Sequence, residues 1–470
     1  MKALLINPPN QNIITNVIPR YIDEDSGHFP PLGLMYIAAY AELHTDYEIK
    51  IFDMQVEEAT YEDLIKNIQK EAPDVVAVTV MTFTILDAIK TARIVKSVNN
   101  DIKIVFGGPH AHIYPEETIR LGYADFVVVG EGEITFSELL NNLHDVDKLK
   151  CTQGLVFKNN GQVIHTGNRP FIEDLDSLPF PARHLTPYKK YHSLLGKKNP
   201  ITTLFTSRGC PYQCIFCYRP HLGKTFRFRS PANIINEINQ CRELGIEEFI
   251  IYDDTFTINR KRVIDICNRI IEQKMDISFD IRARVNTVDE ELLKSLKKAG
   301  CHRIHYGVES ANPEILQILQ KGITLDQIEE AFRITQSAGI ETLAYFMIGS
   351  PTETKNQVLN TIRYAKKLNP DYCLFSITIP FPGTPLYAMM LEKGVAKEDY
   401  WKKFAENPTD KFVPPVWDED LTKEELIKLL KYAYKSFYLR PSYIMRKFYK
   451  IDSWMSLHSH IKAGIKLLKS

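Results

Sequence analysis

The sequence predicts an α/β protein. A doubly wound, Rossmann-like or flavodoxin-like domain comes first, a domain of six β/α repeats follows, and a helical region ends the chain. Two observations support this. Short apolar runs typical of strands alternate with helical stretches in two series, within residues 1–150 and 196–385. Residues 151–195 combine a hairpin pattern with a proline-rich linker, and residues 386–470 show helical patterns.

Composition indicates a globular chain with several domains. Of its 470 residues, 44% are hydrophobic and 25% are charged, which provides an ample core. The formal net charge is zero, so the overall charge does not suggest a nucleic-acid partner. Eight cysteines in a chain of this length do not form a disulfide scaffold, and a cluster of three suits a reducing compartment. With no signal-peptide pattern and no apolar run of transmembrane length, we expect a cytoplasmic protein.

The first series predicts a parallel sheet. In sheets of this type, ligands bind beyond the carboxyl ends of the strands. Glycines there let the backbone approach a large flat ligand, although a glycine after a strand is also an ordinary turn residue. Strands are expected at 3–6, 49–52, 75–80, 102–106 and 126–129, with amphipathic helices at 34–43 and 61–70. Candidate ligand contacts at the strand ends are Thr79, Gly107, Gly108, His110 and Glu131.

The connecting segment contains two features. Residues 154–166 predict a hairpin, because Asn160-Gly161 is typical turn chemistry between two β-rich runs. A linker rich in proline and acidic residues follows at 175–181, and we place the domain boundary near residues 180–195.

The second series predicts six strands whose carboxyl ends meet at one end of the domain, where such folds place their chemistry. An acid after a strand is a helix cap or a ligand contact, and an arginine there pairs with a bound anion or with a neighbouring acid. Strands are expected at 202–207, 248–252, 277–283, 303–308, 342–348 and 373–379, and helices at 231–244, 288–299 and 324–338. The polar, glycine and proline residues after strands two to five are Asp253, Asp254, Arg284, Glu309, Ser310, Gly349 and Pro351.

Three cysteines follow the first strand of this series. The segment RGCPYQCIFCY places Cys210, Cys214 and Cys217 in a C-x3-C-x2-C pattern, and the next cysteine is Cys241. Structural zinc and complete ferredoxin-type clusters take four ligands. Three thiolates on a four-iron cluster leave one iron open for a substrate or cofactor. The alternatives are three buried, redox-inert cysteines or a zinc site.

This cysteine pattern, with Phe216 before the third cysteine, resembles the radical S-adenosylmethionine (radical SAM) family. The resemblance implies a partial (β/α)6 TIM barrel and a [4Fe–4S] cluster held by Cys210, Cys214 and Cys217, whose open iron chelates SAM. It also implies contacts to the SAM amino group, carboxylate, ribose and adenine. The residues at the matching positions are Phe216, Asp253, Asp254, Arg284, Glu309, Ser310, Gly349 and Pro351.

The first domain resembles the cobalamin-binding domain that precedes many radical SAM domains. The resemblance rests on INPP at 6–9, PPLGL at 30–34, GGPH at 107–110 and VVGEGE at 128–133, and it implies that the residues at the strand ends contact cobalamin. The motif D-x-H-x-x-G, whose histidine ligates cobalt, does not occur in this sequence. If cobalamin binds, we therefore expect a base-off form without a protein imidazole ligand, and His110 as a loop residue. A degenerate domain without cobalamin is the alternative.

Together, the two resemblances imply an enzyme that cleaves SAM to a 5′-deoxyadenosyl radical, abstracts hydrogen from an unactivated carbon, and methylates that carbon from methylcobalamin. The substrate would be a small molecule, lipid or natural product, and flavodoxin or ferredoxin would supply electrons. Alternatives are cyclisation or oxidation without methyl transfer, ordinary radical SAM chemistry beside a degenerate first domain, and a non-catalytic electron-transfer or metal-binding protein.

The C-terminal region mixes aromatic and basic residues. Trp401, Phe404 and Trp417 either cap the active site or pack in the core. The basic amphipathic stretch 454–469 predicts either a peripheral membrane contact or a solvated helix.

Overall fold

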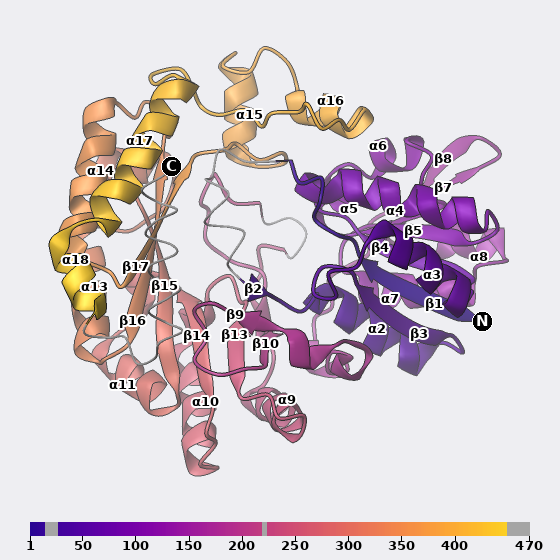
Figure 1. The fold of residues 1–470 in the computed structure, drawn as a ribbon, viewed down its shortest axis with the longest axis horizontal. Helices are drawn as coiled ribbons and strands as arrows, with labels where there is room; N and C mark the ends of the chain where they lie inside the picture. The colour runs from indigo at the N-terminus through magenta and orange to yellow at the C-terminus, as the bar shows by residue number, and fades with distance from the viewer. Residues whose placement is uncertain (15–26, 219–222, 449–470) are drawn as a thin grey trace.

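The computed structural model describes residues 1–14, 27–218 and 223–448. Within this part of the chain, two larger sheets form two neighbouring domains (Figure 1). Most of the C-terminal helices lie along the second domain, but α16 (Tyr400–Glu406) contacts α6 (Pro115–Arg120) of the first. The stretch 454–469, with its expected membrane contact, lies outside the described residues. No described helix combines the length and the apolar character needed to cross a membrane.

The first sheet has the strand order β3-β1-β4-β5-β6-β7-β8 among the described residues. Its first five strands are parallel and follow the order 2-1-3-4-5 of flavodoxin-like sheets, which confirms the expected doubly wound domain. The strand order reverses between β1 and β4. The strands are β1 (Lys2–Asn7), β3 (Glu48–Asp53), β4 (Val75–Thr79), β5 (Lys103–Gly107), β6 (Phe126–Val128), β7 (Leu155–Asn159) and β8 (Gln162–His165).

The β7–β8 hairpin belongs to this sheet. Its turn is the expected Asn160-Gly161, with both φ angles positive at 49° and 81°. Strand β7 pairs antiparallel with β6, so the hairpin that the sequence places in the connecting segment extends the first sheet.

Helices cover both faces of the first sheet. Helix α3 is amphipathic as expected, with Leu64 and Ile68 buried and a capping box between Thr60 and Asp63. The expectation of an amphipathic α2 is wrong: its buried residues lie on several sides because it packs on the sheet, on α7 and against the second domain. The helices are α2 (Leu32–His44), α3 (Tyr61–Glu71), α4 (Ile85–Val98), α5 (Pro109–Ile113), α6 (Pro115–Arg120), α7 (Gly132–Asn141), α8 (Val146–Cys151) and the 3-10 helix η1 (Thr82–Thr84).

The second sheet is the expected partial barrel. Six parallel strands follow one another in chain order among the described residues, and the helices lie on the outer side of the curved sheet (Figure 1). The strands are β10 (Ile201–Leu204), β13 (Glu248–Ile251), β14 (Ser278–Ala283), β15 (Cys301–Glu309), β16 (Glu341–Ile348) and β17 (Tyr372–Ile377). The helices are α9 (Pro231–Glu243), α10 (Arg260–Glu272), α11 (Glu290–Lys298), α12 (Pro313–Ile318), α13 (Leu325–Ser337) and α14 (Lys355–Leu368).

Strand β10 is shorter than expected. It ends at Leu204, because Thr206 and Ser207 turn toward the carboxylate of Asp253. Two short strand pairs complete the fold: β2 (Gly27–His28) with β9 (His192–Ser193), and β11 (Ser207–Arg208) with β12 (Arg227–Phe228). The 3-10 helices η2 (Leu175–Ser177), η3 (Arg183–Leu185) and η4 (Tyr188–Lys190) lie in the segment that connects the domains, whereas η5 (Phe256–Ile258) and η6 (Val285–Thr287) follow β13 and β14 of the barrel.

The C-terminal region is helical, as expected. Helix α17 lies along the open edge of the barrel beside β17 (Figure 1). Its Tyr434 hydroxyl bonds the N–H and C=O of Phe375, and its Tyr438 hydroxyl bonds those of Cys373. These tyrosines therefore satisfy backbone groups that an edge strand would otherwise expose. The helices are α15 (Pro385–Glu392), α16 (Tyr400–Glu406), α17 (Lys423–Tyr438) and α18 (Pro441–Phe448).

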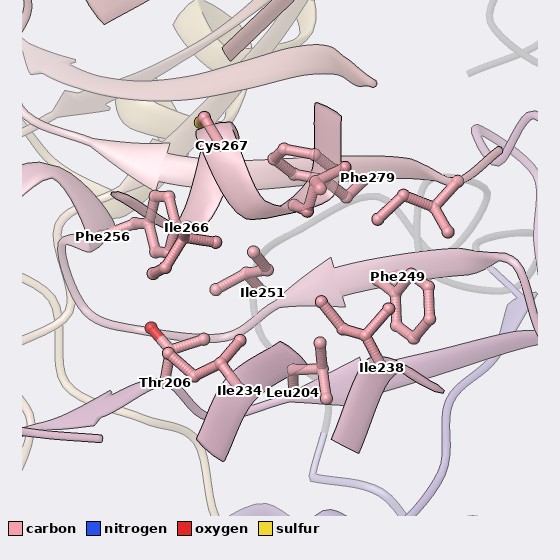
Figure 2. A pocket seen from close by; sticks show the side chains of 12 residues that line it. Leu204, Thr206, Ile234, Ile238, Phe249, Ile251, Phe256, Ile266, Cys267 and Phe279 are labelled. Carbon is pink, nitrogen blue, oxygen red and sulfur yellow. The ribbon is translucent and has the colours of Figure 1, made fainter. Parts of the chain in front are cut away.

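A small cavity lies between the outer face of the barrel sheet and helices α9 and α10 (Figure 2). Its volume is about 10 Å³, roughly the room of one water molecule, and its lining is almost entirely apolar. The hydroxyl of Thr206 is already bonded to Asp253. This cavity is a packing gap in the core, with no room for a substrate.

Candidate active site at the domain junction

The cysteine loop begins at an anchored strand end. The β11–β12 pair closes its base, with Arg208 opposite Arg227. The fully buried carboxylate of Asp253 accepts hydrogen bonds from the backbone N–H and the hydroxyl of both Thr206 and Ser207. Asp253 thus anchors the two residues that lead into the cysteine loop. Its predicted contact with SAM stays untested. Its neighbour Asp254 is exposed.

The three cysteines lie on one loop at the carboxyl end of β10. Cys210 and Cys214 are buried and Cys217 is exposed. No three His, Cys, Asp or Glu side chains in the described residues already stand in a metal-binding arrangement. The donor set nevertheless fits an iron–sulfur cluster, because three thiols share one loop and an Arg284 guanidinium nitrogen lies 3.5 Å from the Cys214 sulfur. A positive charge therefore lies beside one of the three sulfurs that would ligate the cluster.

Arg284 is held from two more sides. Its guanidinium stacks over the Tyr212 ring, 3.8 Å from the ring centroid, and donates to the backbone carbonyl of Lys321. None of its hydrogen-bond partners in the described structure is a carboxylate, so the expected alternative of a salt bridge to a neighbouring acid is not observed. Contact with the SAM carboxylate stays a prediction.

The acid at the end of β15 is paired with a lysine. One carboxylate oxygen of Glu309, Oε1, accepts a hydrogen bond of 2.6 Å from Lys321 Nζ, and both side chains are buried. The same ammonium lies 5.7 Å from the centroid of Phe216, on the cysteine loop. Sequence reasoning found Glu309 and Phe216 but missed Lys321, which is distant in the chain and belongs to no strand.

The end of β16 forms a buried turn. Gly349 has φ +76°, and a Cβ there would lie 2.7 Å from Leu426 of α17. The carboxylate of Glu353 accepts hydrogen bonds from the N–H groups of Gly349 and Ser350, and burial raises the pKa of Glu353 to about 7. Pro351 is also buried in this turn.

Ser310 is fully buried and bonded to Thr361 and Asn312. These contacts favour a structural role for Ser310 over direct contact with SAM, which stays untested.

At the carboxyl ends of the strands of the first sheet, one position requires a glycine. Gly108 has φ +105°, and a Cβ there would lie 3.0 Å from the Val80 carbonyl oxygen, whereas Gly107 would accept a Cβ without a clash. Thr79 is half-buried beside Gly108. This compact, side-chain-poor edge fits the approach of a large flat ligand.

We expected His110 in a loop, but it lies fully buried in helix α5 at the same edge. Its Nδ1 lies 3.2 Å from the Thr82 hydroxyl, and its Nε2 has no hydrogen-bond partner among the described residues. Burial lowers the pKa of His110 to about 4, so the imidazole is neutral at pH 7. An unpartnered, neutral ring nitrogen fits a polar ligand at this edge.

Glu131 lies at the junction of the two domains. Its carboxylate pairs with Arg208 at 2.9 Å and with Arg227 at 3.0 Å, and Glu133 pairs with Arg208 at 2.6 Å. All four side chains are buried. We predicted Glu131 as a cobalamin contact, and that role stays untested. The observed contacts favour a role in joining the cysteine loop to the first domain.

The two domains contact each other beyond the carboxyl ends of their strands. The ring of His112 on α5 lies 6.2 Å from that of Tyr218, which follows the third cysteine. Beside them, Phe83 of the first domain contacts Phe381 and Trp401, with centroids 5.8 and 6.0 Å apart. Trp401 therefore both packs in the core and covers this junction.

The fold and the site define a class of enzyme: a flavodoxin-like domain beside a partial barrel whose first strand leads into three cysteines. Residues 204–365 match the Radical SAM superfamily, and residues 21–140 match the B12 binding domain. An uncharacterized methyltransferase of Pyrococcus horikoshii is 38% identical over 454 residues, which are 96% of this chain and 95% of the relative. An anaerobic magnesium-protoporphyrin IX monomethyl ester cyclase of Cereibacter sphaeroides is 31% identical over 436 residues, 89% of this chain and 68% of the relative.

Solved structures share the fold. The cobalamin-dependent S-adenosylmethionine radical enzyme OxsB, with aqua-cobalamin and SAM bound, has a TM-score of 0.76 at 19% identity and covers 99% of this chain and 72% of its own. The radical SAM methyltransferase TsrM from Kitasatospora setae has a TM-score of 0.68 at 18% identity, covering 84% and 78%. The chain belongs to the radical SAM enzymes with an N-terminal B12 binding domain, and its cofactors are a [4Fe–4S] cluster, SAM and cobalamin.

Proposed function

We propose that this enzyme methylates an unactivated carbon of a small molecule, lipid or natural product. In this proposal, residues 1–150 hold cobalamin and residues 196–385 hold the cluster and SAM. When bound, the cluster and SAM supply the one-electron chemistry that activates a carbon–hydrogen bond, and cobalamin supplies the methyl group.

One observation carries the proposal. Helix α5, at the candidate cobalamin site, contacts the cysteine loop through His112 and Tyr218. The candidate sites of both cofactors therefore lie at the same domain junction. Gly383 makes room for this contact, since a Cβ there would lie 2.5 Å from the Tyr218 ring. Methyl transfer to a carbon activated by SAM requires this proximity, whereas a metal-binding or electron-transfer protein does not.

The chain's own residues bind, orient and exclude water. Cys210, Cys214 and Cys217 ligate iron, and the guanidinium of Arg284 lies beside the Cys214 sulfur. Exposed Asp254 contacts the SAM amino group, while Glu309 offers an acceptor to the ribose hydroxyls. Aromatic side chains from both domains, Phe83, Phe381 and Trp401, cover one side of the junction and help to exclude water from it.

A reducing compartment suits this chemistry. No disulfide links any of the eight cysteines, all of which lie in the described residues. We therefore keep the cytoplasm as the predicted location, with flavodoxin or ferredoxin as the external electron donor and a peripheral membrane contact as a further expectation.

Cyclisation without methyl transfer is the second candidate. The 31% identity to the Cereibacter sphaeroides cyclase favours it, because the match extends over both domains of this chain. The two candidates share the cluster and SAM and differ in the fate of the methyl group.

One assay separates them. Anaerobically reconstituted enzyme receives cobalamin, a reductant, SAM with a labelled methyl group and, in turn, tryptophan, magnesium-protoporphyrin IX monomethyl ester and a hopanoid. Methylation predicts a labelled methyl group in one product, and cyclisation predicts 5′-deoxyadenosine with an unlabelled product. A Cys214→Ala variant should lose SAM cleavage, and retained cleavage would remove the cluster assignment.

A further inference from the structure

The turn after α12, residues 319–322, connects three parts of the candidate SAM site. The Leu319 carbonyl accepts from the N–H of Ile215 on the cysteine loop, at 3.2 Å. The Lys321 carbonyl accepts from Arg284, which follows β14. The Lys321 ammonium donates to Glu309 at the end of β15. One short turn thus contacts the cluster loop and two neighbouring strand ends.

The Lys321–Glu309 pair is built into the fold. Its side chains are 8% and 7% exposed, so removing either charge leaves the other buried without its partner. Gly307 makes room for the pair, because a Cβ there would lie 2.4 Å from Glu309 Oε1 and 2.6 Å from Lys321 Nζ. Glu309 itself has φ +67°, a backbone region that non-glycine residues rarely adopt.

We propose that Lys321 is a positioning residue for SAM. Its ammonium donates to Oε1 of Glu309 and fixes the orientation of the carboxylate, so that Oε2 is left to accept the ribose hydroxyls. Oε2 has no hydrogen-bond donor within the described ranges, which suits this task. Because the same ammonium faces the ring of Phe216, it also couples the ribose acid to the cysteine loop. The proposal deepens, and rests on, the SAM binding in the proposed function.

Two substitutions distinguish the effect of the Lys321 charge from the effect of its size. Lys321→Met removes the ammonium, so the Glu309 carboxylate loses the hydrogen-bond partner that orients it. We expect the Kd of this variant for SAM to rise about tenfold or more, which is typical when a charge-assisted interaction is lost. Lys321→Arg keeps the charge and should restore part of the affinity.

The surface pair Lys367–Glu329 is a matched control. Its nitrogen–oxygen distance of 2.7 Å is similar, but its side chains are 66% and 44% exposed. Lys367→Met removes a comparable contact far from the site and should bind SAM as the wild type does.

The experiment is equilibrium dialysis of anaerobically reconstituted full-length enzyme with radiolabelled SAM and with its 2′-deoxy analogue, alongside iron content and the electron paramagnetic resonance (EPR) spectrum of the reduced cluster. Lys321→Met should retain iron, bind SAM weakly and lose much of the wild-type preference for SAM over the 2′-deoxy form. Glu309→Gln should do the same, and the double variant should be no weaker than Glu309→Gln alone, because Lys321 acts through Glu309.

Wild-type SAM affinity in iron-loaded Lys321→Met would overturn the proposal, and so would an unchanged ribose preference or additive losses in the double variant. If Lys321→Met does not load iron, Lys321→Gln is judged by the same criteria. Failure of labelled methyl transfer in the wild type would instead refute the methyltransferase assignment, and these binding results would stand.

Discussion

Asp253 and Asp254 are neighbours with different surroundings. Asp253 is fully buried and accepts four hydrogen bonds from Thr206 and Ser207, which lie just before the cysteine loop. Asp254 is exposed at the same strand end. The buried acid therefore stabilises the segment that leads into the cysteine loop.

Asp253→Asn should destabilise the protein and impair cluster loading. An amide has one acceptor oxygen, and its NH₂ group would face donors, so buried N–H and O–H groups lose partners at a cost of about 1–3 kcal/mol. Thermal unfolding and iron content measure this. Asp254→Asn makes the same change on the surface and should leave both quantities near the wild type. Equal effects of the two variants would contradict the anchoring role.

His110 should make stability depend on pH. Burial lowers its pKa from 6.5 to about 4, so the unfolded chain binds more protons between these values. The contribution of neutral His110 to the free energy of unfolding is therefore fully present above pH 6.5. It falls by a few kcal/mol as the pH decreases toward 4. Denaturant unfolding of wild type and His110→Asn between pH 4 and 7 checks this: the difference between their stability curves should flatten above pH 6.5. A difference that does not change with pH would refute it.

Helix α17 protects the open edge of the barrel. Tyr434 and Tyr438 lie one turn apart, so both hydroxyls reach backbone groups of the last strand, β17. An exposed edge of a six-stranded parallel sheet would otherwise be open to pairing with another chain.

The double change Tyr434→Phe and Tyr438→Phe should lower the free energy of unfolding by about 1–3 kcal/mol for each hydroxyl, because four backbone groups lose their partners. Denaturant unfolding measures this loss, and light scattering reports any aggregation. Tyr432→Phe is the control, since Tyr432 is 49% exposed on the same helix. If the double variant is as stable as this control, the two hydroxyls do not stabilise the edge strand.

Much of this arrangement follows from sequence, because strand periodicity, capping and turn chemistry are local. The predicted strands of both sheets and the Asn160-Gly161 turn are confirmed. The β11–β12 pair was not predictable, since two-residue strands carry no periodic signal. The partners of Glu131 and Glu309 also depend on contacts distant in the chain, so sequence identified the acids but not the cations beside them.

The two domains are joined by buried charge. Arg208, two residues before the first cysteine, pairs with Glu131 and Glu133 of the first domain. Removing one side of a buried ion pair costs about 3–5 kcal/mol, because the remaining charge lacks a partner. The network therefore holds the cluster loop against the first domain.

Changing both Glu131 and Glu133 to Gln should uncouple the domains. We expect faster limited proteolysis in the 168–200 connection and an earlier thermal transition. Glu116→Gln is the control, because Glu116 pairs with Arg120 on α6, away from this connection, and is 53% exposed. Unchanged proteolysis in the double variant would show that other contacts join the domains.

The central claim is that cobalamin and the iron–sulfur cluster are held at one junction. The most direct measurement is the EPR spectrum of reconstituted wild-type enzyme that contains both cob(II)alamin and the reduced cluster. If both centres lie at this junction, the spectrum should show spin–spin coupling between them. The coupling should be absent from Cys214→Ala protein, which retains cobalamin but lacks the cluster. Two independent, uncoupled signals, or a loaded cluster with no retained cobalamin, would contradict it.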